Sequence, residues 1–148
     1  MGTGNCKLQI ANIKLQIEVT KMNPDDLLER LLDFGARVGL VVDALPNTRM
    51  GRHVASQLVR CGTSPLPNYE EACAAESRAD FIHKLRICLK EARETRSWIR
   101  LIIRGRLLPA KRMTKLLDEA TQLCNILGQS IVTATNNNRR KKDLPLIK

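Results

Sequence analysis

The side chains of this sequence best suited to bind a ligand are basic residues spaced along one predicted helix. Between Lys84 and Arg106 there are eight basic residues and only two acids. Like charges one helical turn apart repel each other, which costs stability unless an anion compensates them. A nucleic-acid backbone is the expected anion, and a plain solvated face is the alternative. The row that we expect to bind it consists of Arg86, Lys90, Arg93, Arg100 and Arg104.

A second ridge lies on a different side of the same helix when residues are placed 100° apart. It contains the only tryptophan of the chain, and aromatic side chains are enriched at protein interfaces. A bundle helix needs only one apolar face for its own core, so we expect this ridge to contact another subunit. The alternative is that the tryptophan lies at the edge of its own core. The ridge residues are Ile87, Glu94, Trp98 and Leu101.

The sequence holds no pattern that is typical of an enzyme. His53 and His83 lie on different predicted helices, without a nucleophile at a useful spacing. Glu91 and Glu94 are one turn apart and could share a metal, but a di-metal bundle needs Glu-x-x-His motifs, which do not occur. The glycines of Gly2–Cys6 lack the lysine of a phosphate-binding loop. We therefore expect no catalytic residues, no metal site and no cofactor.

Composition narrows the class of protein further. The 148 residues suit one domain, and a formal net charge of +10 favours a polyanionic partner over a purely solubilising charge. The five cysteines include no CxxC pair, which indicates a reducing compartment. No apolar run is long enough to span a membrane, and no signal peptide is evident. We expect a cytoplasmic protein that does not bind membranes.

Helical spacing of Leu, Ile, Val and Ala predicts an all-α protein, an antiparallel up-down-up-down four-helix bundle. The first helix begins at the Asn23 cap and ends at Leu45–Asn47, and Thr48 caps the second. Two prolines within Ser64–Asn68 must interrupt the second helix before it resumes. The other boundaries are a third helix capped by Ser77 or Asp80 and ending at Gly105, and a fourth starting at Pro109.

The two ends of the chain differ from the predicted bundle of residues 23–136. Residues 1–22 contain a tandem seven-residue duplication, Cys6–Asn12 followed by Ile13–Val19, and we interpret them as an extension outside the fold. Residues 137–148 lack helical periodicity and are predicted to be a basic flexible tail. Four of its residues are expected to help bind nucleic acid: Arg139, Arg140, Lys141 and Lys142.

Several stretches of this sequence are similar to a known family. They are the "QLVRCGTS" turn at 57–64, Asn68 with its nearby acids, "FIHKLRICLKEARETRSW" at 81–98 and "GRLLP" at 105–109. Together they resemble the four-helix-bundle proteins encoded by intervening sequences of ribosomal RNA genes, the S23 family. The accessory variability protein of diversity-generating retroelements looks like a relative. The chain departs from the family pattern in carrying two prolines near position 66, Cys73 and Arg96.

The resemblance implies an antiparallel bundle that assembles into a homopentameric ring. For the retroelement relative it also implies nucleic-acid binding and a reverse transcriptase as partner. We therefore expect a non-enzymatic, homo-oligomeric protein that binds the backbone of RNA or DNA through a basic helix face. The alternative is a protein-interaction scaffold or an accessory subunit of a polymerase such as a reverse transcriptase.

Overall fold

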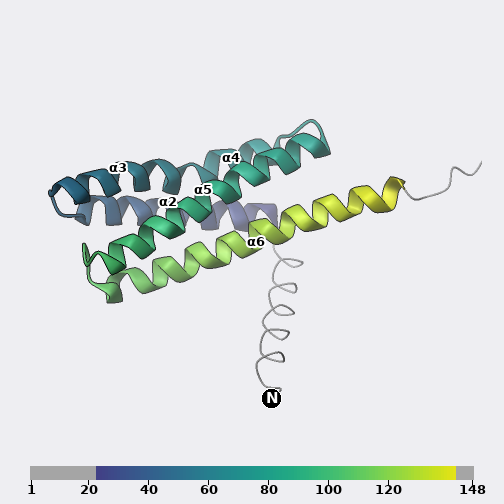
Figure 1. Ribbon diagram of the computed structural model, residues 1–148. Coiled ribbons are helices and arrows are strands. Elements are labelled where there is room, and N and C mark those ends of the chain that lie inside the picture. Colours follow the sequence, from purple (N-terminus) through teal and green to yellow (C-terminus); the bar gives the residue numbers. More distant parts are fainter. Residues whose placement is uncertain (1–22, 143–148) are drawn as a thin grey trace, which may run out of the picture.

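The computed structural model describes residues 23–142, with side chains described as far as Asn136. Within these residues the chain forms α2 (Pro24–Ala44), α3 (Arg49–Thr63), α4 (Pro65–Cys73), α5 (Arg78–Arg104) and α6 (Ala110–Lys142). Figure 1 shows α3 and α4 following one another as one rod, antiparallel to both α2 and α5. The predicted all-α, up-down-up-down four-helix bundle is confirmed. The duplicated segment in residues 1–22 lies outside the described residues.

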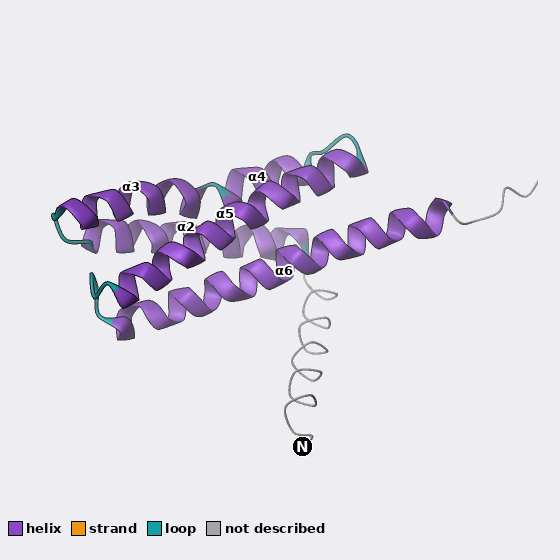
Figure 2. Cartoon of the chain, in the orientation of Figure 1, coloured by secondary structure: helices purple, strands orange, loops and turns teal. Residues whose placement is uncertain are grey.

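The four rods surround one core, and two of them lie at opposite corners. α5 packs against α3, α4 and α6, while α2 packs against α3, α4 and α6 but makes no contact with α5. The connections between rods are short (Figure 2). The outer sides of α2 and α5 therefore face away from each other, on opposite sides of the bundle.

The helix starts follow the predicted capping chemistry. The backbone amide of Asp25 donates to Asn23 Oδ1 at 3.3 Å, and the Asn23 amide donates to Asp26 Oδ2 at 3.1 Å, forming a capping box. Thr48 Oγ1 accepts from the Gly51 amide at 3.0 Å. Of the two candidates for the α5 cap, the structure selects Ser77, whose Oγ accepts from the Asp80 amide at 3.1 Å.

The predicted break in the second rod is present, but it is confined to Ser64. Pro65 and Pro67 both lie in the first turn of α4, where an amide would have no partner within the helix. Ser64 keeps a helical conformation and its amide donates to the Arg60 carbonyl at 3.3 Å. The chain therefore passes from α3 to α4 through a single residue of helical conformation.

The core consists of aliphatic stripes from every rod, largely as predicted. Leu31 and Phe34 of α2 and Val54 and Leu58 of α3 are fully buried, as is Ile99 of α5. Gly62 allows α2 and α3 to approach closely, because a Cβ there would lie 2.5 Å from a Val38 methyl group. Ile102 of α5 and Ile126 of α6 are buried in the same core.

α6 is longer than the sequence pattern indicates. It runs to Lys142, past the predicted boundary of the bundle at Asn136, so the first part of the segment predicted to be a flexible tail is helical. A helix that has already formed extends at low cost, and its last turns need no apolar stripe. In Figure 1 this end of α6 projects beyond the α4–α5 turn. Along the described residues, no helix is long and apolar enough to cross a membrane.

Candidate nucleic-acid interface on α5

The five predicted basic residues share the solvent-facing side of α5. Arg86, Lys90, Arg93, Arg100 and Arg104 are all exposed, with Ser97 continuing the same line. Their sequence spacing of three, four or seven residues keeps them on one side of a helix of 3.6 residues per turn. At 1.5 Å per residue the row is about 27 Å long. We call these five side chains the basic row.

The basic row has no acidic partner among the described residues. Ion pairs there join Arg30 to Glu119, Arg60 to Glu91 and Glu94, and Lys84 to Glu71, and none of them involves the row. The two acids nearest in sequence, Glu91 and Glu94, lie on the side of α5 that faces α3. The row therefore presents uncompensated positive charge to solvent, which suits contact with phosphate groups.

One part of the basic row is hollowed. Ser97, Arg100, Leu101 and Arg104 line a shallow depression of about 210 Å³. Ser97 Oγ donates to the Arg93 carbonyl at 3.1 Å, so its hydroxyl is directed to the helix backbone. The depression is thus flanked by two guanidinium groups one turn apart, an arrangement that fits a phosphate oxygen between them.

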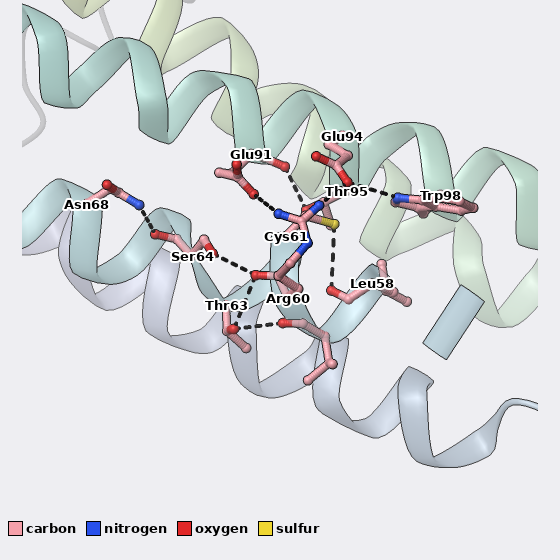
Figure 3. Close-up of polar contacts among 11 residues, drawn as sticks. Leu58, Arg60, Cys61, Thr63, Ser64, Asn68, Glu91, Glu94, Thr95 and Trp98 are labelled. Carbon is pink, nitrogen blue, oxygen red and sulfur yellow. Dashed lines mark hydrogen bonds and ion pairs between the residues drawn. The ribbon is translucent and has the colours of Figure 1, made fainter. Parts of the chain in front are cut away.

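The other charged side of α5 is compensated within the chain (Figure 3). Arg60 of α3 reaches across to α5, where its Nη1 donates to Glu91 Oε2 at 3.2 Å and its Nη2 pairs with Glu94. Trp98 Nε1 donates to the same Glu94 carboxylate at 3.3 Å. His53 of α3 meets the Trp98 ring edge-on, with ring centroids 5.7 Å apart. We call this group the Arg60 cluster.

The Arg60 cluster changes the interpretation of the predicted oligomer ridge. Glu94 and Trp98 are partly buried against α3 of their own chain, and Trp98 packs against the core, while the contact of this ridge with another subunit stays a prediction. Ile87 and Leu101 remain half-exposed on the outer part of the ridge. Glu91 and Glu94, the pair that could share a metal, are both bound by Arg60 instead.

Comparison with known proteins agrees with this architecture. The family pattern of the 23S rRNA-intervening sequence protein matches residues 26–129. The chain belongs to this family. The match spans all of α3, α4 and α5 and includes both the basic row and the Arg60 cluster.

A solved structure supports the same assignment. It is the crystal structure of a protein of unknown function from the S23 ribosomal protein family of Bacteroides thetaiotaomicron, similar with a TM-score of 0.69 and 34% sequence identity. The similar region covers 74% of this chain and 98% of that chain. A search among curated proteins finds no match.

The structure of this intervening-sequence family member exposes basic residues that the helical periodicity of α5 does not reveal. No acid occurs between Glu94 and Asp118, and the basic residues of this interval continue beyond the end of α5. This long interval without an acid is the feature of the sequence that identifies these basic residues. Four of them lie exposed at the α5–α6 turn and the start of α6: Arg106, Lys111, Arg112 and Lys115.

The prediction for the basic residues of the tail is not tested. Arg139–Lys142 belong to the last turns of α6, but their side chains lie outside those described, so their role in binding stays a prediction.

Large apolar side chains are most exposed on α2, where Leu40 is 71% and Leu32 is 50% accessible. These leucines fall within an apolar arc wider than one bundle face, and spacing alone does not show which members face solvent.

One buried thiol, that of Cys88, lies on the inward side of α5. Cys88 lies in the core, where its Sγ donates to the Pro65 carbonyl at 3.2 Å. Burial, with a smaller contribution from Cys124, raises the pKa of the Cys88 thiol to about 12. A thiol with a raised pKa stays protonated and unreactive near neutral pH. Cys88 therefore contributes to packing.

Proposed function

We propose that this protein is a non-enzymatic nucleic-acid-binding protein that contacts phosphates through the basic row of α5. The observation that supports this most is that five exposed basic side chains share one helix side without an acidic partner among the described residues. Arg60, in contrast, is paired with acids of α5 within the chain. The intervening-sequence family to which the chain belongs is named for a ribosomal RNA gene element.

The row favours recognition of backbone and shape over recognition of base sequence. Its members are arginine and lysine, which bind phosphate oxygens, and no aromatic side chain is interleaved with them for base stacking. Contacts of this kind are the same for every sequence. We therefore propose binding of structured RNA or duplex DNA with little sequence preference.

The direct test is reversal of charge within the row. We expect Arg93→Glu with Arg100→Glu to weaken binding of a structured RNA at 0.1 M salt by about 100-fold or more, because two attractions become repulsions. Helical circular dichroism should not change, since both side chains are exposed. Arg49→Glu with Arg78→Glu, which reverses two exposed charges outside the row, is the matched control and should change affinity far less. Retained binding in the double variant would rule out the row as the site.

We propose that self-association uses the exposed part of the ridge. In this proposal Ile87 and Leu101 of one copy pack against the α2 outer side of the next copy, where the exposed Leu32 and Leu40 lie near acids such as Asp33. Because α2 and α5 occupy opposite corners, such a contact is head-to-tail, and a head-to-tail contact closes into a ring when its rotation allows. A homopentamer is the ring that the family resemblance implies.

Light scattering tests this assembly. Leu40→Lys should lower the molar mass in solution, whereas Val59→Lys, which changes an exposed apolar residue of α3, should leave it unchanged. A monomeric wild-type protein would contradict the assembly proposal.

The second candidate function is an accessory role beside a reverse transcriptase, and this role would use the same outer side of α2. Capture of a polymerase that survives nuclease treatment and fails with Leu40→Lys would favour that role.

A further inference from the structure

The end of the bundle where α5 meets α6 carries a second concentration of positive charge. Arg106 lies in the turn, and Lys111, Arg112 and Lys115 follow on the first turns of α6; all four are exposed. None of them forms an ion pair with another described residue. Arg104, the last residue of α5, joins this group to the basic row. We call the four residues the turn cluster.

The helix dipole makes the charges of the turn cluster unfavourable in the free protein. The first turn of α6 contains no acid and instead carries Lys111 and Arg112. The start of a helix bears partial positive charge from its unpaired amide groups, so acids stabilise this position and bases destabilise it. A bound anion would be attracted by both the amides and the cations.

The backbone of Arg106 is a second unfavourable feature at the same place. Arg106 has φ of 53°, and among the described residues it is the only one other than glycine with a positive φ. This left-handed conformation suits glycine or asparagine at the residue that follows a helix. Here the glycine, Gly105, precedes it and has φ of −75°. An arginine in this conformation is uncommon, and replacing it with glycine would relieve the backbone.

We infer that the turn cluster is a second phosphate-binding site, which extends the nucleic-acid path from the basic row around the end of the bundle. The inference rests on the proposed function of the row. Arg104 is the shared element, since it ends the row and adjoins the turn. The ligand of both sites is the backbone of the same nucleic acid, and the turn cluster adds up to four phosphate contacts.

Salt dependence separates this site from general electrostatic attraction. For duplex DNA, each phosphate contact contributes about 0.9 to the slope of log K against log salt. Lys111→Gln with Lys115→Gln should therefore make the slope about 1.8 shallower. Arg78→Gln removes an exposed charge at the opposite end of α5 and should leave the slope unchanged. Fluorescence anisotropy of a labelled 20-base-pair duplex at stepped salt measures all of these variants.

Arg106→Gly distinguishes a binding role from a structural one. Glycine relieves the left-handed backbone, so the melting temperature should rise by about 2–5 °C. Loss of a phosphate contact should at the same time weaken duplex binding by about 3–10-fold at 0.1 M salt. A residue with only a structural role would show the first effect without the second.

The outcomes are distinguishable from those of the row. If Arg93→Glu with Arg100→Glu abolishes binding while the turn variants bind with the wild-type slope, the turn site is wrong and the row stands. If the turn variants lose slope to the same extent as Arg78→Gln, the effect is general electrostatics and the turn site is again wrong. If the wild-type protein does not bind at low salt, both proposals fail together.

Discussion

The two charged sides of α5 show how the same residue types serve different ends on one helix. On the side facing α3, Arg60 binds both Glu91 and Glu94, and Trp98 donates a hydrogen bond to the Glu94 carboxylate. On the outer side, the basic row has no acidic partner among the described residues. The Arg60 cluster joins two helices, whereas the basic row forms no ion pair to another described helix. The first group thus holds the fold together, and we propose that a ligand uses the second.

This comparison predicts opposite consequences for one substitution made on each side. Arg60→Met keeps the aliphatic stem but leaves the mostly buried Glu91 without its cation, so unfolding free energy should fall by about 1–3 kcal/mol. Arg93→Met is the matched change in the basic row and should alter stability by no more than about 0.5 kcal/mol. Urea denaturation measures both.

Binding should follow the reverse order. Arg93→Met should weaken nucleic-acid binding, because it removes a phosphate contact, whereas folded Arg60→Met should bind as the wild type does. If Arg60→Met weakened binding as much as Arg93→Met, the two sides would not be functionally distinct.

Cys88, on the inward side of α5, should make the stability of the protein depend on pH. The folded protein holds the pKa of Cys88 at about 12, above the value of a free thiol, so above about pH 9 the unfolded chain binds fewer protons than the folded chain. Stability should therefore fall as pH rises, by about 1.5–2 kcal/mol at pH 10 from this thiol alone. Cys88→Ala should reduce that fall between pH 7 and pH 10. An unchanged pH dependence would assign the loss to other groups.

The smallest predicted effect concerns repulsion within the basic row itself. Arg100→Glu places an acid one turn before Arg104 and one turn after Arg96, so stability should rise by about 0.3–0.5 kcal/mol while binding weakens. Thermal unfolding and anisotropy on the same samples measure the two changes. A loss of stability would mean that Arg100 has an unrecognised structural role.

Much of the fold follows from local chemistry in the sequence. The Asn23, Thr48 and Ser77 caps each depend on a side chain and an amide within three residues, so short patterns identify them. The end of α6 was placed too early because its last turns carry no apolar period. The prediction that residues 1–22 lie outside the fold concerns residues that the structure does not describe.

Less of the candidate site than of the fold could be predicted from the sequence. Periodicity places the basic row on one side of α5, because this requires only the geometry of one helix. It does not show which neighbour covers the Trp98 side, since Arg60 and His53 come from α3 and depend on tertiary packing. The turn cluster is divided between a turn and a new helix, so no single helical stripe contains it.

The central claim, that the basic row contacts phosphates, is tested most directly by the salt dependence of wild-type binding to duplex DNA, with molar mass followed by light scattering in the same buffers. Five contacts predict that the slope of log K against log salt is about −4.5, and the slope should be steeper if the turn cluster also binds. A slope near zero, or no binding at low salt, would contradict the claim and leave the row as a solvated surface.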